Sequence, residues 1–359
     1  MKKICFIIPV LGNDGAERVA FHLLNNLSKD KYQLYLILTN QGGNYLKELN
    51  SNVKIIELKE KRVRYSIFKL YKVLKNLSPD IAVIFSSEIA TVTGLFIAPF
   101  LKNIKFIVRE INIQSILMTN VLRKLLLKLS YKSIYKIISQ SKDMTDDLIN
   151  YTGINANKIV EINNPIDMKQ INLKLNEKMS SIELKENYKN LVCVGRLAYQ
   201  KGFDLLIEVM GKLKDKKIRA YIIGDGNERG NLETKIKTYG LVDKVFLLGR
   251  KENPYVYMAK ADLFILSSRF EGFPNVLIEA GACGAYSICN ICPGGVNEII
   301  RENLNGNIVN FNDANETAHM ILQKLEEKHD VRRIKSSVLT RYNLDNVVSK
   351  YENFFDIDC

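Results

Sequence analysis

Short apolar runs alternate with longer amphipathic segments along most of the chain, and these runs are rich in β-branched residues. Those of the first half read ICFIIPV, LYLILT, VKIIEL, IAVIF and IKFIV, and those of the second half read LVCVG, RAYIIG, VFLLG, LFILS and YSICN. Strands buried on both faces of a parallel sheet are continuously apolar in this way, and amphipathic segments between them are typical of covering helices. The pattern therefore predicts an α/β fold with two doubly wound, Rossmann-like parallel-sheet domains.

The alternation weakens over residues 163–190, which are polar and rich in lysine. We therefore predict a first domain over residues 1–168, a linker over 169–189 and a second domain over 190–338, and the length of 359 residues also favours two domains. Residues 339–359 are predicted to form a C-terminal helix that returns to the first domain. Sheets of this kind bind ligands where the carboxyl ends of strands open into helix N-termini, so we expect the two sets of loops to face a cleft.

The composition, with 47% apolar and 25% charged residues, is that of a soluble globular protein. The six cysteines are scattered, which indicates reduced thiols rather than a disulfide framework. Cys289 and Cys292 form a CxxC, but no second Cys/His pair stands at zinc-ligand spacing, so we expect no metal site. No apolar run approaches the roughly 18 residues that cross a bilayer. A cytoplasmic location is therefore expected.

The net charge of +13 predicts polyanionic partners, which are nucleic acid, anionic lipid or phosphorylated substrates. Residues 59–75 hold seven basic residues against one acid, and residues 123–142 hold six basic residues and no acid. In the second stretch lysines recur every fourth position among leucines, which predicts a stripe on one helix. The stripe is either a solvated face over a core helix or a basic amphipathic surface for anionic lipid headgroups. Its residues are Lys124, Lys128, Lys132 and Lys136.

Glycine-containing loops follow several of the predicted strands. In LGNDGAERV, Gly12 and Gly15 permit a tight turn before a helix that starts near Ala16, whose free amides suit an anion. Glycine is also common in such turns for steric reasons. Neither a dinucleotide GxGxxG nor a P-loop GxxxxGK[ST] is present.

The loop in VGRLAYQKGFDLLIE carries two cations, Arg196 and Lys201, between a strand and a helix. Arginine offers paired donors and lysine a point charge, so together they could neutralise a diphosphate. The alternative is that both are surface cations on a polar loop. YIIGDGNERG and VFLLGRKENPY repeat the arrangement of strand, glycine and loop further on.

In SSRFEGFPNVLIEAGACG, Glu271 and Glu279 bracket a glycine–proline turn, and a helix is predicted to begin near Asn275. Backbone amides at such a start are unsatisfied and can point at a ligand, although Pro274 itself has none to give. A carboxylate at that place accepts hydrogen bonds from paired hydroxyls, as on a ribose or hexose. The alternative role for either glutamate is to favour the helix start as a capping acid.

These motifs together resemble glycosyltransferase family 4. EGFPNVLIE, GRLAYQKGFDLLIE upstream and IIGDGNERGNLE between them occur in the family's order. GNDGAERV resembles the family's amino-terminal GGAERV, and NNPID at residues 163–167 resembles its hinge motif. The resemblance covers nearly the whole chain. It implies a retaining, nucleotide-sugar-dependent enzyme of the GT-B fold.

The resemblance also implies roles for single residues. Arg196 and Lys201 correspond to the cations that hold the donor pyrophosphate, Glu279 to the glutamate on the nucleotide ribose, and Glu271 to the one near the hydroxyls of the transferred sugar. No cofactor and no metal are implied, because the nucleotide sugar is a co-substrate and these enzymes need no metal-holding DxD. Further donor contacts are implied for Gly15, Arg250, Gly272, Phe273, Pro274, Asn275, Val276 and Leu277.

The chain departs from the family pattern at two places. Asp14 replaces the first glycine of the GG pair, so the phosphate loop is expected to be shaped differently. After the run IKFIV, Ile111 stands where many members carry a histidine, and Glu110 fits the RE-N variants of polysaccharide-assembly members. Glu110 is either a substrate-contacting, catalytic residue or a buried strand-end carboxylate paired to Arg109.

The function implied is that of a hexosyl- or N-acetylhexosaminyltransferase. It would move a sugar from a UDP-sugar to a lipid-linked oligosaccharide, carried on undecaprenyl diphosphate, in the synthesis of surface polysaccharide such as O-antigen. The leaving-group oxygen would take the acceptor proton while Arg196 and Lys201 stabilise the diphosphate. The enzyme would lie peripherally on the inner face of the cytoplasmic membrane and bind no nucleic acid. The alternatives are a non-hydrolysing sugar-nucleotide epimerase of the same architecture, or a basic peripheral-membrane or nucleic-acid-binding protein.

Overall fold

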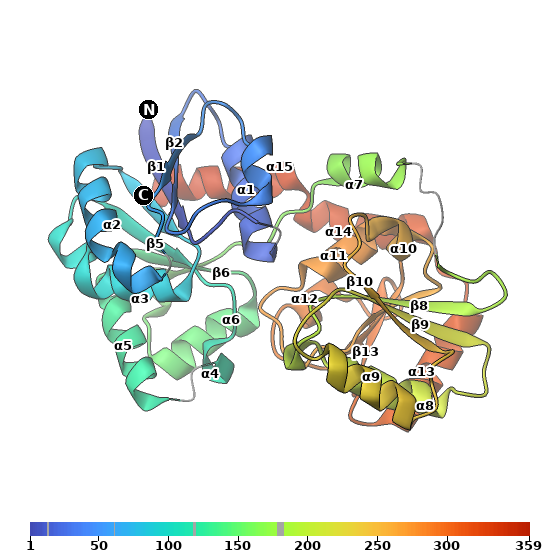
Figure 1. Cartoon of the computed structure of the whole chain (residues 1–359). Coiled ribbons are helices and arrows are strands. Elements are labelled where there is room, and N and C mark those ends of the chain that lie inside the picture. The colour runs from blue at the N-terminus through green and yellow to red at the C-terminus, as the bar shows by residue number, and fades with distance from the viewer. Residues whose placement is uncertain (13, 61, 118–119, 178–182) are drawn as a thin grey trace. The chain divides into compact units, whose positions relative to one another are not determined.

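The computed structural model describes residues 1–12, 14–60, 62–117, 120–177 and 183–359. The chain forms two compact units, unit 1 with Met1–Pro165 and Leu344–Cys359, and unit 2 with Ile166–Asn343. Figure 1 shows that each unit has one sheet with helices on both of its faces. The predicted fold class, two parallel-sheet α/β domains, is confirmed.

The sheet of unit 1 has the strand order β3-β2-β1-β4-β5-β6-β7 within the described residues, and every pair is parallel. In its centre, β1 is in register with β2 from Lys2↔Tyr32 and with β4 from Ile4↔Ile81. The strands are β1 Lys2–Ile8, β2 Tyr32–Leu38, β3 Lys54–Glu57, β4 Ile81–Ile84, β5 Lys105–Arg109, β6 Lys136–Ser139 and β7 Ile159–Glu161. The helices are α1 Gly15–Asn26, α2 Val63–Leu77, α3 Ser87–Phe96, α4 Gln114–Leu117, α5 Val121–Lys132, α6 Lys142–Asp147 and α15 Leu344–Asn353.

The sheet of unit 2 has the parallel order β10-β9-β8-β11-β12-β13, which repeats the order of the first six strands of unit 1. Its strand order reverses between β8 and β11, and this switch point is where such sheets bind ligands. The strands are β8 Lys189–Val194, β9 Ile218–Ile223, β10 Val245–Gly249, β11 Leu263–Leu266, β12 Ser287–Asn290 and β13 Gly306–Val309. The helices are α7 Met168–Leu175, α8 Phe203–Lys212, α9 Arg229–Thr238, α10 Tyr255–Ala259, α11 Asn275–Cys283, α12 Val296–Ile299, α13 Ala314–Glu326 and α14 Val331–Tyr342.

Both faces of each sheet are buried, which explains the continuous apolar runs. Along β1, Ile4 and Phe6 belong to one core cluster, while Cys5 and Ile7 belong to the cluster on the opposite face. Residues of β8 divide in the same way between the two cores of unit 2. None of the helices that the described residues form combines the length and the apolar character that crossing a bilayer requires.

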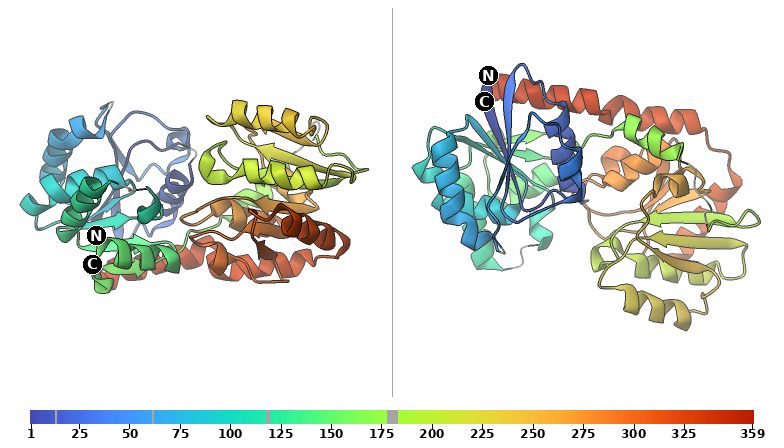
Figure 2. Two further views of the ribbon diagram at one scale, coloured as in Figure 1. Left: turned by 90° about the horizontal axis from the view of Figure 1, so that it is seen from below. Right: turned by 45° about the horizontal axis from the view of Figure 1, so that its top comes forward.

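The C-terminal segment joins unit 1 through α15. Its apolar side chains enter the same core cluster as β1 and α1, and the Lys2 Nζ donates a hydrogen bond to the Phe355 carbonyl at 2.7 Å. Figure 2 shows the two chain ends side by side in both views. The single helix predicted over 339–359 is wrong in one respect, because α14 ends at Tyr342 and Asn343 is extended before α15 begins.

Two other segments differ from the sequence prediction. The predicted linker 169–189 contains part of α7, which packs against α10 and α11 within unit 2, and residues 178–182 of it lie outside the described residues. The predicted lysine stripe is also interrupted. Helix α5 ends at Lys132, and Lys136 begins β6, because the run KIIS pairs with β5 and β7. Lys136 therefore does not share a helix with Lys124, Lys128 and Lys132.

Candidate active site

The two loops that follow β8 and β11 meet at the switch point of unit 2. Gly202 adopts a φ of +60°, and a side chain there would place its Cβ only 2.1 Å from the Ser267 carbonyl oxygen. Gly224, after β9, has a φ of +142°, and its Cβ would lie 1.9 Å from the Gly195 carbonyl oxygen. The glycines thus allow the loops that carry the predicted site residues to pack backbone against backbone.

The predicted site residues Lys201 and Glu271 form an ion pair between these loops. The Lys201 Nζ lies 2.6 Å from the Glu271 Oε1, and the Ser268 hydroxyl donates to the same oxygen at 2.6 Å. The side chains of Lys201 and Glu271 are only 18% and 7% exposed, so the pair is weakly screened by solvent. The structure therefore brings together a cation and a carboxylate that lie 70 residues apart in the chain.

A third loop fixes the backbone of Glu271 and Gly272. The Glu271 amide donates to the Pro293 carbonyl, and the Gly295 amide donates to the Gly272 carbonyl, both at 3.0 Å. Gly294 has a φ of +119°, and its Cβ would lie 1.9 Å from the Glu271 carbonyl oxygen. The glycines of the CPGG sequence therefore permit a close contact that positions the glutamate.

The predicted cations Arg196 and Arg250 are both exposed. Within the described part of the chain, no hydrogen bond or ion pair engages the Arg196 guanidinium. The pKa of Asp225 is lowered mainly by its hydrogen bond from Arg229, and the charge of Arg250 contributes to this shift. Arg196 thus remains available to an anion next to the Lys201–Glu271 pair in the β8 loop.

Helix α11 begins at Asn275 with Pro274 at its N-cap position, and no acidic residue lies in its first turn. Glu271 and Glu279 therefore both lie outside the first turn of this helix. Glu279 lies one turn into α11, and its side chain is buried. The predicted backbone stretch from Gly272 to Leu277 forms the turn and the helix start, with Phe273 buried against Tyr342 at a ring distance of 5.5 Å.

Two family models match the chain. The model of "Glycosyl transferases group 1" matches residues 176–338, and the model of "Glycosyltransferase Family 4" matches residues 13–170. A relative in Campylobacter jejuni, N-acetylgalactosamine-N,N'-diacetylbacillosaminyl-diphospho-undecaprenol 4-alpha-N-acetylgalactosaminyltransferase, is 30% identical over 354 residues, which are 95% of each chain. The chain belongs to the family 4 glycosyltransferases.

Further comparisons support the same family and its fold. The amylovoran biosynthesis glycosyltransferase AmsD of Erwinia amylovora is 25% identical over 334 residues, which cover 93% of this chain and 92% of AmsD. The crystal structure of HepE of Anabaena in complex with UDP and glucose matches with a TM-score of 0.82 at 18% identity, and covers 99% of this chain and 100% of HepE. The resemblance stated from the sequence is thereby confirmed, and the fold is GT-B.

In this glycosyltransferase, the Glu17 carboxylate of α1 folds back on the loop before the helix and accepts a hydrogen bond from it. The Asp14 amide donates to the Glu17 Oε2 at 3.1 Å, and the same oxygen lies 2.8 Å from where a Cβ on Gly12 would be. Burial raises the pKa of Glu17. Asp14 has a φ of −74°, which any residue adopts, so the missing family glycine causes no strain. Gly15, predicted to approach a phosphate, is the first residue of α1.

Glu110 ends β5 in a buried polar cluster of unit 1. Its Oε2 accepts hydrogen bonds from the Gln114 side chain and, at 3.4 Å, from the Ser87 hydroxyl. Its Oε1 is buried and has no hydrogen-bond partner among the described residues. Burial raises the pKa of Glu110 to about 7, against the smaller opposing effect of these hydrogen bonds.

The expected pairing of Glu110 with Arg109 is absent. Arg109 is buried, and its guanidinium donates to the Asn164 side chain and, at 3.1 Å, to the Tyr351 hydroxyl. Neither of these partners is a carboxylate, and the Arg109 Nη1 has no partner among the described residues. The interpretation of Glu110 as a buried strand-end carboxylate is therefore right about burial and wrong about the partner.

Helix α5 packs through one face only. Leu127, Ser130 and Tyr131 are buried, and Gly94 of α3 lies so close that its Cβ would be 2.3 Å from the Ser130 carbonyl oxygen. The leucines between the lysines of the predicted stripe, apart from Leu127, are exposed on the other side of the helix, and Leu122 is 62% exposed. Lys128 and Lys132 are exposed beside them, and the Lys124 Nζ lies 4.0 Å from the Tyr151 ring centroid. The helix thus presents leucine and lysine together to solvent.

Sequence reasoning missed the partners of the Lys201–Glu271 pair. Ser268 bonds Glu271 directly, and Arg269 and Asp204 join the two loops by a further ion pair. Opposite charges stand near the two predicted site residues in SRFEG and KGFD, but this pattern alone does not indicate that Arg269 and Asp204 meet. Within the described residues no cluster of three His, Cys, Asp or Glu side chains is arranged as a metal site.

Proposed function

We propose that this enzyme is a retaining glycosyltransferase that uses a UDP-sugar as donor. It transfers a hexosyl or N-acetylhexosaminyl residue to an oligosaccharide carried on undecaprenyl diphosphate, in surface polysaccharide synthesis. The observation that carries the proposal is the arrangement at the switch point of unit 2. There the free guanidinium of Arg196 stands in the same loop as Lys201, and Lys201 is held against Glu271 at 2.6 Å.

The donor is proposed from the charges of this site. A nucleoside diphosphate leaving group gains negative charge as its bond to the sugar breaks, and fixed cations stabilise that charge best where water is excluded. Arg196 can offer paired donors and Lys201 a point charge. UDP is proposed because the HepE structures contain UDP, and in two cases UDP with glucose or UDP-glucose.

The mechanism follows from the same residues. Glu271 is engaged by Lys201 and Ser268 through Oε1, so it orients the lysine and is not arranged as a free general base. We therefore assign the acceptor proton to the leaving phosphate oxygen, on the face from which the acceptor attacks, which retains the anomeric configuration. Glu279 is assigned to the ribose hydroxyls, and the turn from Gly272 to Leu277 to the sugar and phosphate. The cations neutralise the diphosphate in this scheme, so no metal is required.

The acceptor is proposed from unit 1 and from the relatives. The names of the Campylobacter relatives describe transfer to diphospho-undecaprenol-linked sugars. On α5, exposed leucines lie beside Lys128 and Lys132, a combination that suits the boundary between acyl chains and anionic headgroups. We therefore place the enzyme peripherally on the inner face of the cytoplasmic membrane. Phe68 on α2 is 81% exposed and lies in the other basic stretch, residues 59–75. This stretch therefore also combines an exposed apolar side chain with neighbouring cations.

The test is a transfer assay with purified enzyme, a panel of UDP-, GDP- and ADP-sugars, and undecaprenyl-diphosphate-linked acceptors in the presence of EDTA. We expect product with one UDP-sugar, with the anomeric configuration of the donor by NMR, and a loss of activity in Arg196→Ala. Arg333→Ala, an exposed arginine on α14, is the matched control and should stay active. Inverted product, a requirement for metal, or epimerised donor without transfer would each contradict the proposal.

A further inference from the structure

The loop that carries Lys201 is joined to the loop that carries Glu271 by a second ion pair. The Arg269 guanidinium donates to both carboxylate oxygens of Asp204, at 2.7 Å and 2.6 Å. Its Nη1 also donates to the Tyr199 carbonyl at 2.9 Å, and its central carbon lies 4.1 Å from the Tyr199 ring centroid. Arg269 therefore reaches from the β11 loop across the turn before Lys201 to the start of α8.

Further hydrogen bonds join the same two loops, and together with the Arg269–Asp204 ion pair we call them the seam. The Arg269 amide donates to the Gln200 carbonyl at 2.8 Å, and the Gln200 side chain donates to the Phe270 carbonyl at 3.0 Å. The Ser267 hydroxyl donates to the Lys201 carbonyl at 2.9 Å. The bonds lie directly beside Lys201 on one loop and directly before Glu271 on the other. The seam therefore fixes the position of Lys201 relative to Glu271.

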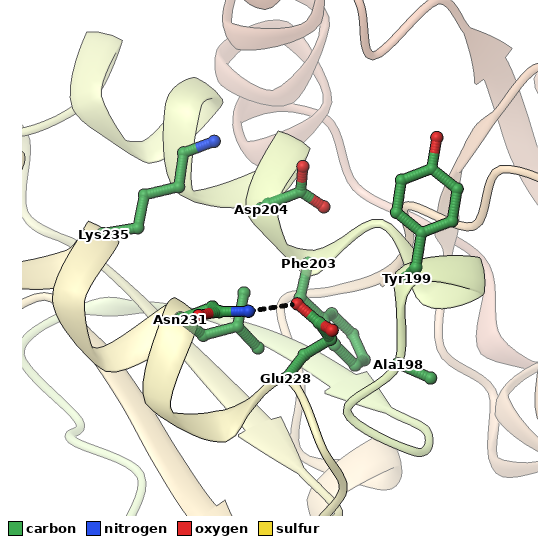
Figure 3. Close-up of a pocket in the computed structure, with 8 residues that line it drawn as sticks. Ala198, Tyr199, Phe203, Asp204, Glu228, Asn231 and Lys235 are labelled. Atoms are coloured by element: carbon green, nitrogen blue, oxygen red, sulfur yellow. Dashed lines mark hydrogen bonds between the residues drawn. The ribbon is translucent and has the colours of Figure 1, made fainter.

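Apolar packing fixes the Lys201 loop only at its two ends, at Leu197 and Phe203. Residues 198–201 contain no buried side chain, and Tyr199 is 67% exposed. Behind the loop lies a pocket of about 130 Å³, with Tyr199 and Asp204 on one side and Asn231 and Lys235 of α9 on the other. Figure 3 shows these side chains around the open space. The pocket separates the turn at residues 198–201 from α9 on that side, so the polar contacts with the β11 loop are the contacts described here that hold the turn beside Glu271.

Both members of the Arg269–Asp204 pair stay charged at neutral pH. Burial pushes the pKa of Asp204 upward, but the hydrogen bonds and charge of Arg269 outweigh burial and hold it below its usual range. The hydrogen bond to Asp204 in turn raises the pKa of Arg269. A paired, two-pronged contact of this kind fixes direction as well as distance.

We propose that Arg269 and Asp204 are positioning residues of the donor site. Their ion pair holds Lys201 in register with Glu271, so donor affinity depends on them although neither contacts the donor. The inference rests on the function proposed above, because it assumes that Lys201 meets the donor diphosphate.

The chain contains a matched control for this pair. Glu208 lies one turn after Asp204 on α8 and pairs with Lys235 of α9 at 2.6 Å. The side chains of Lys235 and Glu208 are 24% and 37% exposed, against 21% and 34% for Arg269 and Asp204. Glu208 contacts neither of the two loops through this pair. Glu208→Gln thus removes an ion pair of similar exposure from the same helix and breaks no hydrogen bond of the seam, although the charge of Glu208 also contributes to the raised pKa of Arg269.

The experiment measures the dissociation constant of UDP by calorimetry for the wild type, Asp204→Asn, Arg269→Lys and Glu208→Gln, with melting temperatures alongside. We expect Asp204→Asn and Arg269→Lys to weaken UDP binding by about tenfold, since the loss of a charged two-pronged contact loosens Lys201. Glu208→Gln should stay within about twofold of the wild type. Equal effects of Asp204→Asn and Glu208→Gln on binding would overturn the inference.

A double-mutant cycle separates positioning from a general loss of stability. In a Lys201→Gln background, adding Asp204→Asn should change UDP binding by less than about twofold, because the residue through which it acts is gone. A full tenfold effect in that background would show that the pair acts by another route and would overturn the inference. If the wild type binds no UDP, the proposed function fails instead, and that result is distinct from wild-type binding that Asp204→Asn leaves unchanged.

Discussion

The carboxyl edges of the two sheets have the same strand order, but their charged residues are arranged differently. In unit 2, Lys201 and Glu271 are charged and paired across adjacent loops, and Arg196 beside them is free among the described residues. In unit 1, Glu110 is buried with one oxygen unpartnered among those residues, and Arg109 is bonded only to neutral groups. The same strand order therefore supports a charged ion pair in one unit and, in the other, a buried carboxyl whose pKa is raised to about 7.

This difference shows how much of a site is built by loops rather than by the sheet. In unit 2, glycines at positive φ bring the loops after β8, β9, β11 and β12 into backbone contact, so charges from distant segments meet. In unit 1, the Glu17 carboxylate accepts the hydrogen bond of the Asp14 amide just before α1, in a region where free helix amides would suit an anion. The function proposed above, with a charged donor in unit 2 and a hydroxyl-bearing acceptor in unit 1, would use both arrangements.

The largest expected effect comes from removing the charge at the edge of unit 2. Under the proposed mechanism, Lys201→Ala should lower kcat/KM by about a thousandfold, because it would remove a cation from the leaving group and leave Glu271 without its partner. Initial rates over a range of donor concentrations measure it. Lys212→Ala, an exposed lysine on α8, should leave the rate unchanged. A loss below tenfold for Lys201→Ala would contradict a catalytic role for the charged pair at the edge of unit 2.

The second prediction concerns the titratable cluster of unit 1. The pKa of Glu110 is raised from 4.5 to about 7 in the folded state. Its protonation therefore adds stability that is fully present below the unfolded pKa and is lost as the pH rises through about 7. The wild type should thus lose roughly 3 kcal/mol of unfolding free energy between pH 4.5 and pH 8 relative to Glu110→Gln.

Urea unfolding of both proteins across this pH range, followed by circular dichroism, measures the difference. Glu88→Gln, at an exposed position on the neighbouring α3, is the control and should follow the wild type. Parallel pH curves for the wild type and Glu110→Gln would show that Glu110 is ionised throughout, and unit 1 would then hold a charged edge like that of unit 2.

A third prediction uses the corrected boundary of α5. Neutralising Lys128 and Lys132 to Gln should weaken binding to anionic vesicles by about thirtyfold, since each lysine near such a surface contributes about 1 kcal/mol. Lys136→Gln is the control, because Lys136 lies in β6 and its Nζ donates to the Asn157 carbonyl at 2.9 Å. Flotation with vesicles of phosphatidylglycerol measures both. An equal loss from Lys136→Gln would indicate that vesicle binding depends on the total charge of the protein rather than on the surface of α5.

The smallest effect is expected at the start of α1. Glu17→Ala removes the carboxylate that accepts from the Asp14 amide, and should lower the unfolding free energy by about 1 kcal/mol. Thermal unfolding of the variant beside Glu48→Ala, an exposed glutamate of the same unit, measures it. If Glu17→Ala is as stable as the wild type, the carboxylate is no cap, and the loop is open to an external anion as in unit 2.

The sequence was sufficient for features that depend on local pattern. The apolar runs predict the strands up to β5 and most of unit 2, because burial on both faces imposes a continuous pattern. The motif residues Arg196, Lys201 and Glu271 are likewise recognisable within short windows. Strand β6 was missed, because its run KIIS is short and follows lysines at helical spacing.

Features that depend on register between distant segments could not be predicted. The Arg269–Asp204 pair requires β8 and β11 to be neighbours, although more than 60 residues separate the two side chains. The true partners of Arg109 were hidden for the same reason, since Asn164 and Tyr351 come from different segments that converge on β5. A single sequence gives the charges of such residues but not their distances.

The return of α15 to unit 1 has a consequence for the order in which the protein is made. Phe355 is synthesised 353 residues after Lys2, yet it fills the same core that β1 begins. Val347, Val348, Tyr351 and Phe354 enter that core with it. During translation, unit 2 therefore emerges from the ribosome complete while unit 1 still exposes part of its interior to water. A chain that stalls before residue 347 leaves the ribosome with the earlier-made half as its aggregation-prone part.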